Sequence, residues 1–455
     1  MFSEPEGVES PRCLRPTYHF TPSSGRVGDP NGLCWYHGLY HLFYLHFWKW
    51  PQDTGQSCWG HLVSEDMIRW REAPTAFFPG ETYDGQSCWS GCFRVIEGVP
   101  TIFYSGVGED GVSACIATSG DMYQWTKSDA NPLMAPEELR FNWDHCVWRE
   151  GDAYLMLTGG KRGAELFGSK DLRSWTSLHP LLAEDPARGL TKWDCPHLFK
   201  LGAKHVLIAY AHPMRQNIYF VGRFEGCRFH VEGQGNLDIG VNAGGTFSAA
   251  HPSYRDPHGR IVVVGMMQEH GQDAASMQNR GWSGAISLPR VLTLGDDNRL
   301  RFDPIAEVGS LRRRHWRFTD IGLAPDRTHQ LPRVSGTCLE IEAAIDPGSA
   351  RECRLGVLCG DDDEKGATIV YDATRGTISL NGASETLALA DGELLRLRVF
   401  VDRPLVEVFA NRRVCLSVWS YPRREAAGLV RLSAVDGHAE VKWIDVWEMG
   451  KSSGQ

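Results

Sequence analysis

Three aspartates in this chain have sequence surroundings that suit acid chemistry. Asp29 lies within a Gly-Asp-Pro-Asn-Gly run, Asp144 within Trp-Asp-His-Cys, and Asp194 within Trp-Asp-Cys-Pro-His. Asp144 and Asp194 are 50 residues apart. Converging carboxyl groups can cleave a glycosidic bond, because one attacks the sugar carbon while another protonates the leaving oxygen. The local pattern also leaves a plainer alternative open, in which an aspartate only caps a turn or a helix.

The stretch 28–32 combines residue types that favour turns. Proline fixes φ, and glycine and asparagine tolerate left-handed conformations. The following residues, 33–47, are rich in aromatic and aliphatic side chains and predict a buried strand that is broken at His37-Gly38. Asp29 is therefore expected at the edge of a strand, where a rigid scaffold can hold its carboxylate in a pocket.

A motif that repeats along the chain indicates the structural unit from which the fold around these acids is built. The pattern Ser-x-Asp-(Met or Leu)-x-x-Trp begins at Ser64, Ser119 and Ser169, so the spacings are 55 and 50 residues. An apolar, strand-like segment precedes each copy. A unit of roughly 50 residues with about four strands has the size of a propeller blade. Two further strand-rich units, 205–229 and 260–294, lack the motif.

These five units predict a five-bladed β-propeller over residues 12–310. In a propeller the inner strand of every blade lies at the central axis. Asp29, Asp144 and Asp194 would therefore converge on one funnel. A β-sandwich with coincidental Ser-x-Asp turns is the alternative fold.

The sequence changes character beyond the basic stretch 311–314. Segments 338–343 and 395–401 alternate apolar and polar residues, as half-exposed antiparallel strands do. Turn residues such as Asn381-Gly382 separate the strands. The chain is therefore predicted to be all-β, with a C-terminal β-sandwich over residues 325–449.

Composition narrows the class of protein and its compartment. The net charge is −9, which argues against a nucleic-acid partner. No segment approaches the roughly 18 apolar residues of a membrane span, and the first residues lack the features of a signal peptide. The 13 cysteines are scattered without a Cys-x-x-Cys pair, which is typical of free thiols in a reducing compartment. We therefore expect a soluble, cytoplasmic protein without a membrane partner.

Further motifs extend along most of the chain. They are Arg-Pro-Thr-Tyr-His-Phe-Thr-Pro at 15–22, Asp-Pro-Asn-Gly at 29–32, Tyr-His-Leu-Phe-Tyr at 40–44, Trp-Gly-His-Leu-Val-Ser at 59–64, Trp-Ser-Gly at 89–91, Arg-Gly-Trp-Ser-Gly-Ala at 280–285, Leu-Pro-Arg at 288–290 and Val-Glu-Val-Phe-Ala-Asn at 406–411. Together these motifs resemble glycoside hydrolase family 32, which contains invertases, fructosidases and fructanases.

The resemblance implies a five-bladed propeller, a β-sandwich and a retaining mechanism. Asp29 would be the nucleophile, Asp144 the transition-state stabiliser and Asp194 the general acid/base. Retention requires the two working carboxyl groups to lie only about 5 Å apart. No metal or other cofactor is implied. The candidate substrate-binding residues are Asn31, Trp59, Trp89, Ser90, Trp143, His145 and His197.

Five positions depart from the family pattern. Gly28 stands where the family usually has Asn, Leu45 where it has Gln, His145 where it has Pro, and Asp194 where it has Glu. Trp143 also replaces the Arg of the family's Arg-Asp-Pro motif. An aspartate carboxyl reaches roughly 1.5 Å less far than a glutamate carboxyl, and a shift of that size matters for proton transfer. These changes remodel the sugar pocket but keep three acids.

Three functions remain open at this point. The first is hydrolysis of a small β-fructofuranoside-like oligosaccharide, the expected small-molecule carbohydrate substrate. The second is transfer of the glycosyl group to a sugar acceptor by the same fold. The third is a catalytically silent furanoside-binding protein. The oligomeric state, monomer or homodimer, is left open by the sequence.

Overall fold

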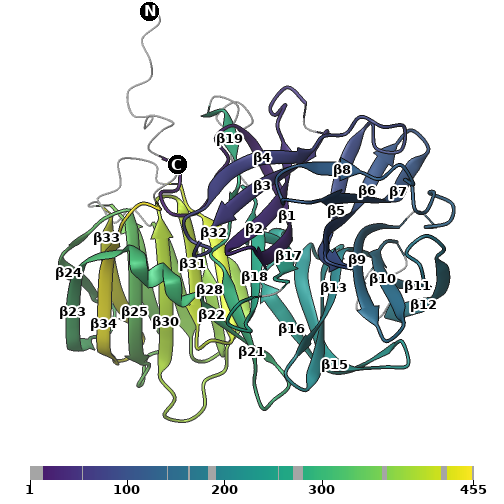
Figure 1. Ribbon diagram of the computed structural model, residues 1–455. Coiled ribbons are helices and arrows are strands. Elements are labelled where there is room, and N and C mark those ends of the chain that lie inside the picture. The colour runs from purple at the N-terminus through teal and green to yellow at the C-terminus, as the bar shows by residue number, and fades with distance from the viewer. Residues whose placement is uncertain are drawn as a thin grey trace, which may run out of the picture.

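The structure is a computed structural model that describes most of the chain (Figure 1). The described residues are 14–53, 55–140, 142–161, 164–182, 191–254, 256–269, 280–360, 366–421 and 428–452. In these residues the strands form seven sheets, with the short 3-10 helices η3 (Val241–Ala243) and η4 (Ala306–Leu311) between them. The prediction of an all-β chain is confirmed. Within those ranges, no helix has the length and apolar content that crossing a membrane requires.

Five of the sheets lie between residues 25 and 304, each built mainly from antiparallel neighbours in sequence. The first contains β1 (Gly25–Tyr36), β2 (Leu39–Phe47), β3 (Cys58–Ser64), β4 (Arg71–Phe77) and, in parallel with β1, β19 (Trp282–Ser283). The second contains β5 (Ser87–Ile96), β6 (Val99–Gly108), β7 (Gly111–Ser119) and β8 (Trp125–Lys127). The third contains β9 (Trp143–Glu150), β10 (Ala153–Gly159), β11 (Ala164–Ser169) and β12 (Thr176–Leu182).

The remaining two of these five sheets follow the same plan. The fourth contains β13 (Lys192–Leu201), β14 (Lys204–His212), β15 (Gln216–Glu225) and β16 (Arg228–Asp238). The fifth contains β17 (Phe247–Pro252), β18 (Ile261–Met267), β20 (Ala285–Ile286), β21 (Arg290–Leu294) and β22 (Leu300–Pro304). The short 3-10 helix η3 (Val241–Ala243) joins the two sheets.

The first strands of the five sheets form a closed ring of contacts. Strand β1 contacts β5, β5 contacts β9, β9 contacts β13, β13 contacts β17, and β17 contacts β1 again. In Figure 1, β1, β5, β9, β13 and β17 accordingly gather toward the middle of the right-hand part of the molecule. Side chains from all five sheets can therefore meet at one place.

Each of these first strands carries a β-bulge opposite its second strand. The bulged positions are Gly28-Asp29 in β1, Ser90 in β5, Asp144-His145 in β9, Cys195-Pro196 in β13 and Ala249-Ala250 in β17. A bulge places two residues opposite one and redirects a side chain, which is why bulges are common next to active sites. The run 28–32, predicted as a turn, instead lies inside β1.

The repeated Ser-x-Asp motif joins the third and fourth strands of three sheets. In the first copy the Asp66 carboxylate accepts hydrogen bonds from the backbone N–H groups of Ile68 and Arg69, at 2.9 and 2.8 Å. The second and third copies repeat this arrangement with Asp121 and Asp171. The motif is thus an Asx turn that starts the outermost strand.

The described strands between residues 312 and 449 form two six-stranded antiparallel sheets, on the left in Figure 1. One contains β23 (Arg312–Leu323), β34 (Ala439–Met449), β25 (Cys338–Asp346), β30 (Leu395–Asp402), β31 (Leu405–Ala410) and β32 (Val414–Trp419). The other contains β24 (Thr328–Ser335), β33 (Leu429–Val435), β26 (Glu352–Cys359), β27 (Ala367–Asp372), β28 (Thr377–Leu380) and β29 (Ala383–Thr386). The 3-10 helix η4 (Ala306–Leu311) leads into β23.

These two sheets share one hydrophobic core, to which both contribute buried aliphatic side chains such as Ile341 and Leu432. Strand β23 belongs to this arrangement although it lies ahead of residue 325, from which the sequence predicted the second domain. Its burial pattern is mostly exposed over residues 312–323, which is why the core signal in the sequence begins later.

A buried ionic network connects the N-terminal segment, the fifth sheet and β31. The His19 ring bonds the carboxylates of Asp402 and Glu407, each at 2.9 Å. Glu407 also pairs with the Arg290 guanidinium at 2.7 Å, and Arg290 pairs with Asp238 at 2.9 Å. His19 is thus an ion-pairing residue between the two parts of the molecule.

Candidate functional site

A cavity of about 400 Å³ opens where the first strands meet. The bulged residues Gly28, Asp29, Ser90, Asp144, Cys195 and Ala249 all line it. Asp194 lies directly before the β13 bulge and lines it too. The structure therefore brings the three predicted acids together in one cavity, as the sequence predicted.

Two polar side chains, Ser90 and Asn31, hold Asp29 in place. The Ser90 hydroxyl donates a hydrogen bond of 2.9 Å to Asp29 Oδ2. The Asn31 side chain donates to the Asp29 carbonyl at 2.9 Å and accepts from the Gly91 N–H at 3.0 Å. Burial raises the pKa of Asp29, although the Ser90 hydrogen bond opposes this. Asn31 thus orients the backbone that carries Asp29.

Asp144 and Cys195 meet on the same side of the cavity. Asp144 Oδ2 accepts hydrogen bonds from the Cys195 backbone N–H at 2.9 Å and from its thiol at 3.4 Å. The same sulfur lies 3.7 Å from Asp29 Oδ2. Both residues have positive φ, 57° for Asp144 and 47° for Cys195, a backbone conformation that the bulges impose. Burial, with the charges of Asp194 and Asp29, raises the pKa of Asp144 to about 8.

Asp194 has a different environment. Its Oδ1 accepts a hydrogen bond from Trp143 Nε1 at 2.8 Å and pairs with Lys192 Nζ at 3.2 Å. Its Oδ2 lies 2.7 Å from His212 Nε2. Burial would raise the pKa of Asp194, but the His212 hydrogen bond, the Lys192 charge and the Trp143 hydrogen bond outweigh it and bring it below its usual value.

The predicted substrate-binding residues divide into two groups. Trp89, Ser90 and Trp143 line the cavity. Asn31, Trp59, His145 and His197 are almost fully buried and are not among the described side chains that line it. Trp59 donates from Nε1 to the Trp89 carbonyl at 3.0 Å and thereby supports a lining residue.

The two histidines of the second group pack within the ring of first strands. His145 Nδ1 lies 3.1 Å from the Ser105 hydroxyl, which also accepts from the Asp144 N–H at 2.8 Å. The rings of His197 and His251 are 4.3 Å apart. His145 and His197 therefore support the bulged backbone.

Several cavity residues were missed by the sequence reading. Arg26, Lys192, Tyr210, His212 and Arg215 all line the cavity. Lys192 and Arg26 could have been found, since each lies two or three residues before a predicted acid. Tyr210 and His212 lie on β14, and their nearness to Asp194 depends on strand pairing that no local pattern announces.

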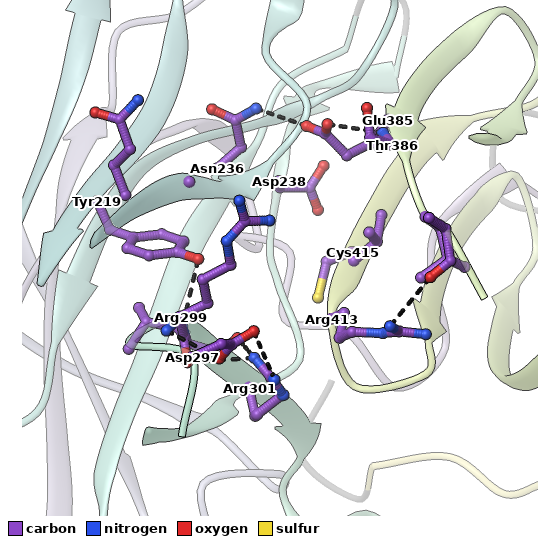
Figure 2. A pocket seen from close by; sticks show the side chains of 16 residues that line it. Tyr219, Asn236, Asp238, Asp297, Arg299, Arg301, Glu385, Thr386, Arg413 and Cys415 are labelled. Atoms are coloured by element: carbon purple, nitrogen blue, oxygen red, sulfur yellow. Dashed lines mark hydrogen bonds and ion pairs between the residues drawn. The ribbon is translucent and has the colours of Figure 1, made fainter. Parts of the chain in front are cut away.

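A second cavity of about 230 Å³ lies between the fourth sheet and the C-terminal sheets (Figure 2). Asn236 of β16 donates a hydrogen bond of 2.6 Å across it to Glu385 of β29. Arg299 and Arg301 border it from the loop before β22 and from β22 itself. It contains none of the three predicted acids. Among the described residues, no group of three or more His, Cys, Asp or Glu side chains is spaced to hold a metal ion.

Two family models match almost the whole chain. The family model "Glycosyl hydrolases family 32 N-terminal domain" matches residues 19–304, and "Glycosyl hydrolases family 32 C terminal" matches 307–448. A sucrose-6-phosphate hydrolase of Zymomonas mobilis is 27% identical, covering 95% of this chain and 92% of that protein. A fructan 6-exohydrolase of Beta vulgaris is 30% identical, covering 96% of this chain and 87% of that protein.

Solved structures share the fold over nearly the whole length. Fructan 1-exohydrolase IIa from Cichorium intybus superposes with a TM-score of 0.86 at 21% identity, covering 98% of each chain. Sucrose-6-phosphate hydrolase from Lactobacillus gasseri gives a TM-score of 0.82 at 22% identity, covering 98% of this chain and 94% of that one. The resemblance found in the sequence is thus confirmed. Because the two family models together span almost the entire chain, this protein belongs to family 32 of the glycosyl hydrolases and is a glycoside hydrolase.

Proposed function

We propose that this protein is a retaining hydrolase of small β-fructofuranosides. The proposed architecture is a five-bladed β-propeller over residues 12–310, followed by a β-sandwich whose predicted range of 325–449 is extended forward to include β23. The closed ring of first strands and the core shared by the two six-stranded sheets support it. The twelve described cysteines are free thiols, in keeping with a cytoplasmic location.

The observation that carries the proposal is the convergence of three carboxyl groups from three different sheets in one cavity. Asp29, held by Ser90, attacks the anomeric carbon and forms a covalent glycosyl intermediate. Asp194 acts as the general acid/base on the leaving oxygen. Asp144 binds sugar hydroxyls and stabilises the transition state. Trp89, Ser90 and Trp143 contact the sugar directly, while Asn31, Trp59, His145 and His197 act through the backbone that they support.

The cations of the cavity favour a second candidate substrate, a fructoside that carries an anionic group. Arg26, Lys192 and Arg215 line the cavity together with the three acids. The Arg26 guanidinium stacks on the Phe47 ring at 3.8 Å, which holds its charge at the wall. Relatives of this chain include sucrose-6-phosphate hydrolases. A phosphate ester is an anion that such a set of side chains can bind.

The test is a substrate panel that contains sucrose, sucrose 6-phosphate, raffinose and inulin-type oligosaccharides. If the protein is a hydrolase, at least one of these substrates should release free fructose. If the cations bind phosphate, kcat/KM should be higher for the phosphorylated sugar. Fructose transferred to sugar at high substrate concentration would instead identify a transferase. Binding of the panel without any product would identify a silent furanoside-binding protein and contradict the proposal.

A further inference from the structure

The surroundings of Asp194 conflict with its acting alone as a proton donor. Both of its carboxylate oxygens already face donors: Trp143 and Lys192 on Oδ1, and His212 on Oδ2. Two of these donors are basic side chains. A carboxylate with such partners is stabilised in its ionised form, and a general acid must carry a proton when the bond to the leaving group breaks.

His212 can supply the missing proton. Its Nε2 lies 2.7 Å from Asp194 Oδ2, within the range of a charge-assisted hydrogen bond. In the β13–β14 pairing, Asp194 is opposite Tyr210 and Lys192 is opposite His212, so Asp194 and His212 are diagonal neighbours on one face. The side chains are 20% and 24% exposed, respectively, and both line the cavity.

The other groups around this pair come from four strands and from the loop between β14 and β15. Lys192 precedes Asp194 on β13, and Tyr210 precedes His212 on β14, with its ring 5.3 Å from the imidazole. Asp29 of β1 and Asp144 of β9 face the pair across the cavity, as do the cations Arg26 and Arg215. The pair thus lies among both acidic and basic side chains of the cavity.

We propose that His212 and Asp194 share one proton across their hydrogen bond, and that this proton is the one delivered to the leaving oxygen. The inference rests on the proposed hydrolase function. It also explains the shorter acid at position 194. The family's Glu works as a single carboxyl group, whereas here an Asp is extended by an imidazole that stores the proton. Interacting groups of this kind titrate as a pair.

The proton balance closes over both steps. In the first step Asp29 bonds to the anomeric carbon, the glycosidic C–O bond breaks, and the shared proton moves to the leaving oxygen. Asp194 remains a carboxylate and His212 becomes neutral. In the second step water attacks the glycosyl carbon, its proton returns to the pair, and Asp29 is released as a carboxylate. No outside oxidant or reductant is needed.

The decisive variant is His212→Gln, with His205→Gln at the far end of β14 as the matched control. A glutamine amide can still donate a hydrogen bond to Asp194 but cannot store a transferable proton. We expect kcat/KM on sucrose-type substrates to fall at least about 100-fold. The loss on an activated aryl fructoside, whose leaving oxygen hardly needs a proton, should be less than about tenfold. The alkaline limb of the pH profile should move at least about one pH unit lower, because Asp194 then holds the proton alone.

Wild-type behaviour of His212→Gln on both substrates would overturn the proposal. Equal losses on both substrates with an unchanged pH profile would also overturn it, since they would indicate a merely structural role. His212→Ala gives a further check, because added imidazole should restore part of its activity if the ring carries the proton.

A measurement without substrate separates this inference from the proposed function. Carbon NMR of ¹³C-labelled aspartate, with Asp194 assigned through Asp194→Asn, follows ionisation of its carboxyl group directly. The wild-type carboxyl should stay ionised to lower pH than in His212→Gln. Identical titration in both proteins would overturn the pair even if fructosides are hydrolysed. If the two proteins differ in this titration but the wild type hydrolyses no fructoside, the proton-sharing pair stands and the proposed function is refuted.

Discussion

Neighbouring charges divide the three carboxyl groups of the cavity into two kinds. Burial and two nearby carboxylates raise the pKa of Asp144 to about 8. At Asp194 burial acts in the same direction, but His212, Lys192 and Trp143 outweigh it and lower the pKa. Opposed environments of this kind are how enzymes separate the roles of similar acids. Taken alone, the raised pKa would make Asp144 the general acid. An experiment must therefore compare Asp144 and Asp194 in that role.

Leaving-group dependence distinguishes Asp194 from Asp144. Asp194→Ala should lower kcat/KM on sucrose-type substrates by roughly 10²- to 10⁴-fold and should affect an activated aryl fructoside much less. Added azide should restore part of the activity, because a small anion can attack the glycosyl intermediate without a base. Asp144→Ala should lose activity on both substrates without rescue. The reverse pattern would assign the acid role to Asp144.

At the same scale, the sequence singled out the three acids that line the cavity but not all of their partners. Asp29, Asp144 and Asp194 were recognisable because each has a distinctive neighbourhood along the chain. His212 was not, because it lies 18 residues from Asp194 and meets it only through the pairing of β13 with β14. Trp59 was expected at the sugar, yet its side chain is fully buried. An aromatic next to a motif does not reveal which face of the strand it occupies.

At the scale of elements, the β-bulges are the feature that builds the cavity. Each first strand is interrupted opposite its second strand, and the extra residue turns a side chain or a backbone group toward the axis of the ring. The run 28–32 has the composition of a turn, but its backbone pairs with β2 on both sides of the bulge. Gly, Pro and Asn suit bulges and turns alike, so only the pairing partner, which is distant in sequence, decides between them.

The Asx turns allow a prediction at this scale. Asp66→Ala should lower the free energy of unfolding by about 1 kcal/mol, since two backbone N–H groups lose their acceptor. Asp66→Asn should retain most of the stability, because its side-chain oxygen accepts the same hydrogen bonds. Neither variant should change kcat/KM, because Asp66 is remote from the cavity lining. Urea unfolding provides the measurement, and an equal loss in both variants would argue against the turn as the cause.

At the scale of the whole molecule, a buried ionic network joins the two groups of sheets. Two buried basic side chains, His19 and Arg290, pair there with three buried carboxyl groups, those of Glu407, Asp402 and Asp238. Burial alone would lower the pKa of His19, but the hydrogen bonds that its ring donates to Asp402 and Glu407 outweigh burial and raise this pKa to about 9. An imidazolium held in this way makes stability depend on pH.

The sign of that dependence follows from the raised pKa. The contribution of His19 is fully present below the pKa of an unfolded histidine, roughly 6.5, and is lost as pH rises through about 9. His19→Gln should therefore be destabilised by roughly 3 kcal/mol at pH 6 and should show a weaker loss of stability toward pH 9.5. Urea midpoints measured across this range test it. Parallel curves for the two proteins would show that His19 does not carry the charge.

The order of the sheets was partly readable from the sequence because three of them carry the Ser-x-Asp motif. The fourth and fifth sheets lack it, and they were inferred from strand-like segments alone. Strand β23 was placed outside the second domain because most of its side chains are exposed or only half-buried, so the segment lacks the apolar content of a core strand. Repeats and alternation report on local packing, whereas the joining of sheets across the molecule depends on residues such as His19 and Asp402.

The most direct test of the account is the turnover of Asp29→Asn on the substrate that the panel selects. An amide is nearly isosteric with the carboxylate but cannot form the covalent intermediate. We expect kcat/KM to fall at least about 10³-fold, which corresponds to roughly 4 kcal/mol in the barrier. Substrate binding should persist, and the free energy of unfolding should rise, because burial raises the pKa of Asp29 and a neutral side chain avoids that cost. Turnover within about tenfold of wild type in a folded variant would contradict the assignment of Asp29 as the nucleophile.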